Sequence, residues 1–133
     1  MVVHATPRDP MDEYAPPDPA FWKPRLAGVK CDYLIVGHTH QPYTLRVNGT
    51  LIINPGSVGL SRDSDPRSAY AIIDGDDVQL KRAEYPVEQT LQAMEERTPD
   101  ATARQMLEDV FRTGALPTRW LRNGNGTNGN GAH

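Results

Sequence analysis

The sequence predicts an α/β fold, with strands in the first two thirds of the chain and helices after them. Three observations predict it. Residues 32–37 form a compact apolar run ended by glycine, which is typical of a buried strand. Asn48-Gly49 lies between two strand-forming segments and supplies the positive φ angles of a type I′ hairpin turn. From Val87 onward, apolar residues recur at helical spacing.

The first 83 residues are expected to form strands and one irregular excursion. Residues 1–4 are predicted to form a short strand that ends on a histidine. Residues 5–30 hold six of the twelve prolines, which excludes a long helix and leaves short helical turns near 11–14 and 20–26. Strands at 43–47 and 50–53 form the first hairpin. Strands at 68–74 and 78–82, joined by the turn 74–77, form the second.

Two helices are expected to follow. The first covers residues 87–97. The second begins at Thr98-Pro99, a cap followed by proline at the first helical position, and ends near residue 113 because Gly114 follows. The apolar face of the second helix comprises Met106, Leu107, Val110 and Phe111. We therefore divide the chain into residues 1–97, a helical extension at 98–122 and an Asn/Gly-rich tail at 123–133 that is expected to be disordered.

Composition excludes several function classes. With 133 residues the chain suits one domain, and a net charge of -3 argues against a nucleic-acid footprint. No apolar run approaches the length of a membrane-spanning helix. A single cysteine, Cys31, excludes an internal disulfide and fits a reducing environment, so we expect a cytoplasmic protein.

Three of the four histidines follow apolar strands and are candidate metal ligands. His38 and His40 come directly after the run 32–37, and residues two apart in an extended segment point to the same side. His4 ends the predicted first strand. Neutral imidazole binds manganese, zinc, iron or nickel. One such histidine is usually structural, and His-x-His alone is a weak signal, but the whole hexapeptide 37–42 after a buried strand is a stronger one.

Gly37-His38-Thr39-His40, the segment Ile-Asn-Pro-Gly-Ser-Val-Gly at 53–59 and the segment Ser-Ala-Tyr-Ala-Ile-Ile-Asp at 68–74 resemble the C-terminal half of the calcineurin-like metallophosphoesterases. The small bacterial and archaeal phosphodiesterase subgroup is the most similar, and its His-Gly-Ser-Pro-Arg-Asp-Pro segment resembles residues 4–10. The resemblance covers residues 1–97. It implies the C-terminal part of a two-sheet sandwich with flanking helices.

The resemblance also implies a metal-dependent phosphoester hydrolase with two divalent ions (Mn, Zn, Fe or Ni). Carried over by position, His4 and His38 would ligate one ion and His40 the other. Four further residues are candidates for binding the phosphoester substrate: Asn54, Ser57, Arg8 and Arg62. For each, a structural role is an open alternative, namely a proline-glycine turn for the first two and a surface charge for the arginines.

The chain departs from the family in one respect. It contains no Asp-x-His and no Asn-His dipeptide, which the family's N-terminal half supplies. We therefore expect an incomplete chain that is inactive alone and whose upstream DNA encodes the missing motifs. The alternatives are a non-catalytic remnant or interaction module that binds one metal ion or none, and a split enzyme completed by a partner chain. A half-sandwich exposes apolar faces and strand edges, so self-association is expected too.

Overall fold

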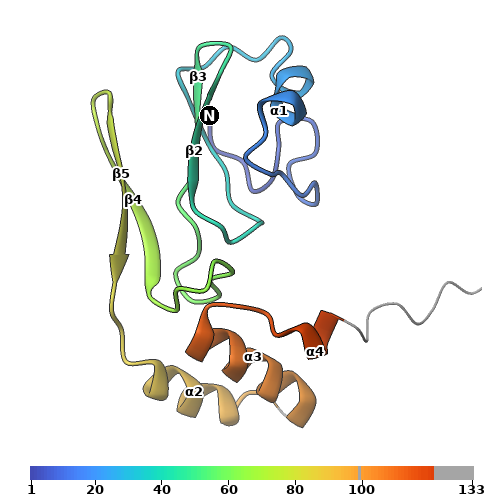
Figure 1. Ribbon diagram of the computed structural model, residues 1–133, viewed down its shortest axis with the longest axis vertical. Helices are drawn as coiled ribbons and strands as arrows, with labels where there is room; N and C mark the ends of the chain where they lie inside the picture. The colour runs from blue at the N-terminus through green and yellow to red at the C-terminus, as the bar shows by residue number, and fades with distance from the viewer. Residues whose placement is uncertain (99, 122–133) are drawn as a thin grey trace, which may run out of the picture.

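The computed structural model describes residues 1–98 and 100–121 and confirms the α/β fold class. Within that part of the chain, strands form one three-stranded sheet and one two-stranded sheet, and helices lie at both ends of the sequence. Figure 1 shows the two sheets side by side in the upper part of the molecule, with the C-terminal helices below them. The expected tail at 123–133 lies outside the described residues.

The larger sheet has the strand order β1-β3-β2. Strand β1 (Tyr33–Ile35) runs parallel to β3 (Thr50–Asn54), and β2 (Tyr43–Val47) runs antiparallel to it. The predicted hairpin turn is confirmed, because Asn48 and Gly49 have φ angles of 52° and 87°. Residue pairing starts at Val47 opposite Thr50, so the turn has two residues.

The predicted strand at residues 1–4 is wrong as a regular element. Val2 and Ile35 form one isolated parallel bridge. The segment still follows the outer edge of β1, because Ile35 N–H donates to the Met1 carbonyl at 2.9 Å and Val3 N–H donates to the Ile35 carbonyl at 3.1 Å. The segment pairs on one side only, so a single bridge with its flanking backbone hydrogen bonds takes the place of a regular strand. Its exposed side carries Val2, which is 73% exposed.

One face of this sheet is covered by the proline-rich segment. Helix α1 (Pro19–Arg25) is capped by the Asp18 carboxylate and packs against β2, close to the turn predicted at 20–26. Trp22 is fully buried there, and its indole N–H donates to the Pro16 carbonyl at 2.9 Å. The buried cluster around it comprises Ala15, Leu26, Leu34, Val36, Tyr43, Val47 and Ile52. Residues 11–12 form only a turn.

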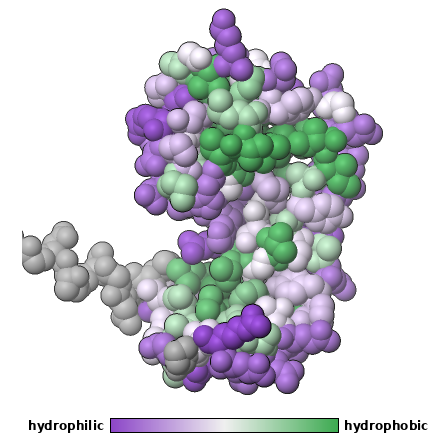
Figure 2. Space-filling view, turned by 180° about the vertical axis from the view of Figure 1, so that it is seen from behind, coloured by the Kyte–Doolittle hydropathy of each residue, from purple (hydrophilic) through white to green (hydrophobic). Residues whose placement is uncertain are grey.

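The second sheet is the hairpin of β4 (Ser68–Asp74) and β5 (Asp77–Ala83). The phenol of Tyr33 donates to the Gly75 carbonyl at 2.6 Å, which ties the hairpin tip to the larger sheet. Large apolar side chains of the hairpin are exposed: Tyr70, Ile72, Ile73 and Leu80. Figure 2 shows a band of hydrophobic surface on the rear of the molecule. A two-stranded sheet is marginal by itself, so these side chains offer a surface for further packing.

Helices α2 (Val87–Glu95), α3 (Ala101–Thr113) and α4 (Thr118–Leu121) complete the fold. Gly114, with φ 67°, ends α3 as predicted. The predicted start is wrong: Asp100 caps α3 by accepting from Ala103 N–H at 2.6 Å, and Pro99 lies outside the described residues. The sequence analysis missed α4. Among the described helices, none is long and apolar enough to cross a membrane.

Candidate metal centre

The structure brings His4 and His38 together. His4 Nε2 and His38 Nδ1 are 3.0 Å apart, and the two rings meet edge to face with centroids 5.0 Å apart. Backbone pairing produces this contact, because Gly37 N–H donates to the His4 carbonyl at 2.9 Å. A Cβ on Gly37 would lie 3.6 Å from that carbonyl oxygen. Segments 34 residues apart thus place two imidazoles at one end of the sheet.

The loop that carries His38 and His40 is not extended, so the extended backbone assumed for this pair is wrong. Both residues are left-handed, with φ angles of 61° and 58°. Thr39 N–H donates to the Gly37 carbonyl at 2.7 Å, which closes a three-residue γ-turn of the positive-φ type around His38. Such backbone costs about 1–3 kcal/mol per residue and clusters at functional sites. Histidine is among the residues that tolerate it best.

His40 is oriented by a backbone carbonyl. Its Nδ1 lies 2.7 Å from the Leu60 carbonyl oxygen. A carbonyl only accepts, so this contact requires a proton on Nδ1 and leaves the Nε2 lone pair of a neutral ring available. Metal-binding histidines usually have such a partner on the second nitrogen.

The donor set fits a metal ion in part. Zinc–nitrogen bonds of about 2.0–2.1 Å in tetrahedral geometry separate two nitrogens by about 3.3 Å, close to the 3.0 Å between His4 and His38. However, the described residues include no group of three or more His, Cys, Asp or Glu side chains that could hold an ion. His4 and His38 can therefore supply two ligands of a metal ion, and further ligands are needed to complete its coordination.

Asn54 holds the loop of His38 and His40 through hydrogen bonds of its side chain. It ends β3 and is fully buried. Its amide N–H₂ donates to the Gly37 carbonyl at 2.8 Å and to Thr39 Oγ1 at 3.0 Å, and its Oδ1 accepts from Gly56 N–H at 2.9 Å. The sequence analysis named Asn54 as a substrate-binding candidate and missed this role. No local sequence pattern indicates this role, because the residues that Asn54 contacts in the histidine loop are distant in the sequence.

Ser57 and Arg62 lie in the loop next to the histidines. The Ser57 hydroxyl accepts from Leu60 N–H at 3.0 Å, in the turn whose carbonyl orients His40. Arg62 N–H donates to the His40 carbonyl at 3.1 Å, and its side chain is exposed. Gly56 makes this close packing possible, because φ is 89° and a Cβ would lie 2.8 Å from the Ala69 Cβ. Substrate binding by Ser57 and Arg62 stays a prediction.

Arg8 belongs to an ion cluster in the segment that follows His4. Arg8 pairs with Glu13, and Arg25 donates to the same carboxylate at 2.5 and 2.8 Å. The Thr6 hydroxyl also donates to Glu13, at 2.6 Å. Hydrogen bonds from Arg25, opposed by burial and helped by Thr6, lower the pKa of Glu13 from 4.5 to about 2. The cluster fixes the loop that follows His4, and Arg8 stays exposed.

The aromatic residues of the proline-rich segment have separate roles. Trp22 is a core residue. Phe21 lies under the Arg25 guanidinium, 3.4 Å from the ring centroid. Tyr14 is 54% exposed and meets His38 edge-on, with centroids 6.5 Å apart. Of the three, only Tyr14 is placed to contact a molecule bound at the histidines.

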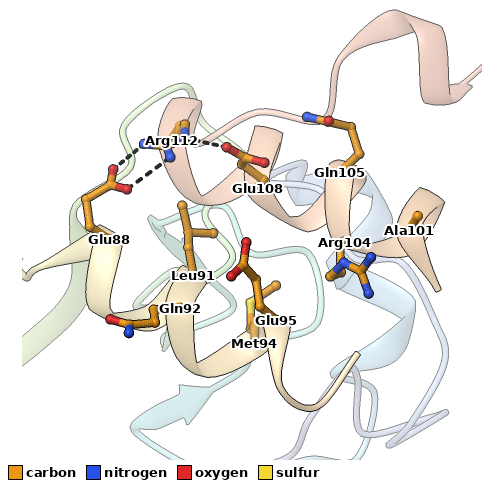
Figure 3. Close-up of a pocket in the computed structure, with 10 residues that line it drawn as sticks. All are labelled: Glu88, Leu91, Gln92, Met94, Glu95, Ala101, Arg104, Gln105, Glu108 and Arg112. Carbon is orange, nitrogen blue, oxygen red and sulfur yellow. Dashed lines mark hydrogen bonds and ion pairs between the residues drawn. The ribbon is translucent and has the colours of Figure 1, made fainter. Parts of the chain in front are cut away.

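A separate cavity lies between α2 and α3. It has a volume of about 410 Å³ and is lined mostly by polar and charged side chains (Figure 3). Arg112 pairs with Glu88 and Glu108 at one end of it. No histidine lines it, so this cavity is distinct from the candidate metal centre.

Comparison with known families shows what the chain is similar to. A family model described as the calcineurin-like phosphoesterase superfamily domain matches residues 2–78. This range includes the three histidines, Asn54, the β2–β3 hairpin and β4, and ends at the start of β5.

Two curated relatives match shorter stretches. A probable metallophosphoesterase of Methanothermobacter thermautotrophicus is 40% identical over 58 residues, which is 42% of this chain and 34% of the relative. A probable metallophosphoesterase of Mycoplasma genitalium is 45% identical over 40 residues, 30% of this chain and 24% of the relative. The chain thus spans about a third or less of the length of these relatives.

Two solved structures share the fold over most of the chain. A metallophosphoesterase from Sphaerobacter thermophilus matches with a TM-score of 0.73 and 31% identity, over 86% of this chain and 55% of that one. A hypothetical protein from Pyrococcus horikoshii matches with a TM-score of 0.72 and 17% identity, over 87% of this chain and 46% of that one. The second likeness concerns the fold alone.

Proposed function

Because the chain belongs to the calcineurin-like phosphoesterase superfamily, we propose that it carries the histidine half of a metal-dependent phosphoester hydrolase site. The observation that supports this most is the 3.0 Å separation between His4 Nε2 and His38 Nδ1. His40 lies two residues further along the same loop, and the Leu60 carbonyl leaves its Nε2 available.

In this proposal His4 and His38 share one ion and His40 serves a second, as the resemblance implies. Bound divalent ions (Mn, Zn, Fe or Ni) would lower the pKa of a water and offset the charge of a phosphoester. Neutral imidazoles add no negative charge, so carboxylate ligands are needed to balance two ions. The chain's own residues hold the imidazoles in place and leave the open side of the site to substrate.

Four residues are proposed to act on the phosphoester or to hold those that do. The exposed Arg8 and Arg62 lie on either side of the histidine loop in sequence and can donate to phosphate oxygens. Ser57 is close to the His40 turn and can add a hydroxyl. The Asn54 amide is occupied by hydrogen bonds to the loop that carries His38, so its contribution to substrate binding is indirect.

We also propose that the missing ligands come from a polypeptide that packs along residues 1–4 and on the β4–β5 hairpin. The outer side of the 1–4 segment is an open edge directly beside His4, and one face of the hairpin exposes Ile73 and Leu80. That polypeptide can be a partner chain; a second copy of this one could cover the same surface but has no Asp-x-His or Asn-His motif to supply. A cytoplasmic location is part of the proposal, because Cys31 is a free thiol.

The alternative is an interaction module that binds one ion or none. It is favoured by the lack of any group of three metal-ligating side chains among the described residues. In that case the hairpin surface, rather than the histidines, would carry the function.

Metal titration separates the two proposals. The purified chain is titrated with Zn²⁺ and with Mn²⁺ by calorimetry, next to His38→Ala and His40→Ala. We expect weak binding of one ion, lost in His38→Ala. Equal affinity in all three proteins would refute the metal site. Hydrolysis of bis(p-nitrophenyl) phosphate by the chain alone is expected to be negligible, and metal-dependent turnover that vanishes in His40→Ala would show that the site is complete.

A further inference from the structure

One side chain contacts both sides of the turn that carries His38. The Asn54 amide donates to the carbonyl of the residue before it, Gly37, at 2.8 Å. The same amide donates to the hydroxyl of the residue after it, Thr39, at 3.0 Å. Both bonds join positions 15 to 17 residues apart in the sequence. Asn54, the fully buried last residue of β3, thus bridges the γ-turn.

The turn needs such support. His38 and His40 are both left-handed, a backbone conformation that is unfavourable for residues other than glycine unless the surroundings stabilise it. Thr39 between them is 1% exposed, so its hydroxyl cannot turn to water without opening the loop. A buried hydroxyl or amide that is left without a hydrogen-bond partner destabilises the fold. Without the Asn54 bonds, the local chain would relax towards an ordinary backbone and move both imidazoles.

We propose that Asn54 is the positioning residue of the candidate metal centre. By holding the γ-turn, it keeps His38 beside His4 and keeps His40 Nδ1 on the Leu60 carbonyl. The proposal deepens the proposed function and rests on it only for the statement that these histidines are ligands. It assigns Asn54 a role in placing ligands, in addition to the predicted contact with substrate.

The chemistry of the site demands an amide at position 54. Two N–H groups donate to two oxygens of the turn while the amide oxygen accepts from Gly56 N–H. A carboxylate of the same shape has no proton to donate, so Asn54→Asp would place an oxygen against the Gly37 carbonyl oxygen. Asn54→Asp therefore tests the hydrogen bonds with almost no change in volume.

The first experiment needs no metal. The imidazole nitrogens are observed by ¹⁵N NMR in the metal-free chain, at a pH where the rings are neutral. Wild type is expected to show His40 as one tautomer, with the proton on Nδ1. Asn54→Asp and Thr39→Val are expected to show a mixture of tautomers. Thr39→Ser, which keeps the hydroxyl, is expected to resemble wild type.

Thr50→Val is the matched control. Thr50 is also buried in this sheet, and its hydroxyl donates to the Cys31 carbonyl at 2.8 Å, away from the histidines. Its loss should lower stability by a similar amount and leave the His40 tautomer unchanged. If Thr50→Val disturbs His40 as much as Asn54→Asp does, the effect is general loosening and the proposal is wrong. Should Asn54→Asp fail to fold, Thr39→Val decides in its place.

The second experiment measures affinity for Zn²⁺ alone. Losing a group that orients a ligand typically weakens metal binding by about 10- to 100-fold, and we expect this range for Asn54→Asp but wild-type affinity for Thr50→Val. Equal affinities in all folded variants would overturn the proposal. If wild type itself binds no Zn²⁺, the proposed function fails, whereas the metal-free tautomer spectra still decide whether Asn54 positions the histidines.

Discussion

Glu13→Gln removes the charge at the centre of the ion cluster that holds the loop after His4. In wild type, the Glu13 carboxylate accepts hydrogen bonds from Thr6 and Arg25 and pairs with Arg8. Glutamine has nearly the same shape but cannot accept from all three partners. We expect the variant to fold, with a lower free energy of unfolding near neutral pH.

The magnitude follows from the pKa. A carboxyl whose pKa falls from 4.5 in the unfolded chain to about 2 in the folded one contributes at most about 3 kcal/mol. Arg8 is mostly exposed and Glu13 is not sealed from water, so screening reduces this to about 1–2 kcal/mol. A folded-state pKa below the unfolded value stabilises the fold above pH 4.5. The contribution is lost as pH falls from 4.5 towards 2.

The assay is urea unfolding followed by circular dichroism, at several pH values between 7 and 2. The difference in unfolding free energy between wild type and Glu13→Gln should be about 1–2 kcal/mol at pH 7 and should shrink as pH approaches 2. Glu96→Gln, at the exposed end of α2, is the control and should match wild type at every pH. A difference that is constant across this pH range would refute the reasoning, because it could not come from the carboxylate.

Three further predictions concern packing and association. Trp22→Ala should lower the unfolding free energy by about 3–5 kcal/mol, because it empties a fully buried site in the core; a loss below 1 kcal/mol in urea unfolding would contradict the core described above. Gly114→Ala should lower the free energy of unfolding by more than about 2 kcal/mol, because the new Cβ would lie 2.5 Å from the Asp65 backbone. Gly28→Ala places its Cβ in open space and should lower the free energy of unfolding by less. Similar thermal melting of the two variants would argue against the contact between Gly114 and Asp65. Leu80→Lys should reduce self-association measured by analytical ultracentrifugation, while Gln79→Lys, which faces the other side of the hairpin, should not; equal sedimentation of both variants and wild type would remove the hairpin from the proposed interface.

Local signals predicted much of the fold. Asn48-Gly49 specified its hairpin because both residues readily adopt positive φ angles, and the structure shows them doing so. Gly114 ends α3 for the same local reason. Asp100 shows the limit of such signals: the sequence analysis chose Thr98 as the cap because a proline follows it, whereas the cap is Asp100.

The site was harder to predict, because its contacts are distant in sequence. The histidines at 4, 38 and 40 were named as candidate ligands, but an extended loop was assumed, and the left-handed turn is hydrogen-bonded to Asn54 from another strand. The carbonyl of Leu60 that orients His40 is 20 residues away. No local pattern encodes which backbone oxygen meets which ring nitrogen. The role of Asn54 could be recognised only once β3 lay beside the loop.

The pairing of residues 1–4 with the edge of β1 has a consequence for folding kinetics. The β2–β3 and β4–β5 hairpins close turns of two residues, and their pairing can form early. His4 meets His38 only after a loop of 34 residues closes, which costs about 3 kcal/mol of chain entropy. The edge segment should therefore dock late and detach first. Amide hydrogen exchange at Val3 and Gly37 should be faster than at Leu51, so the two imidazoles can separate in brief local openings while the hairpins stay folded.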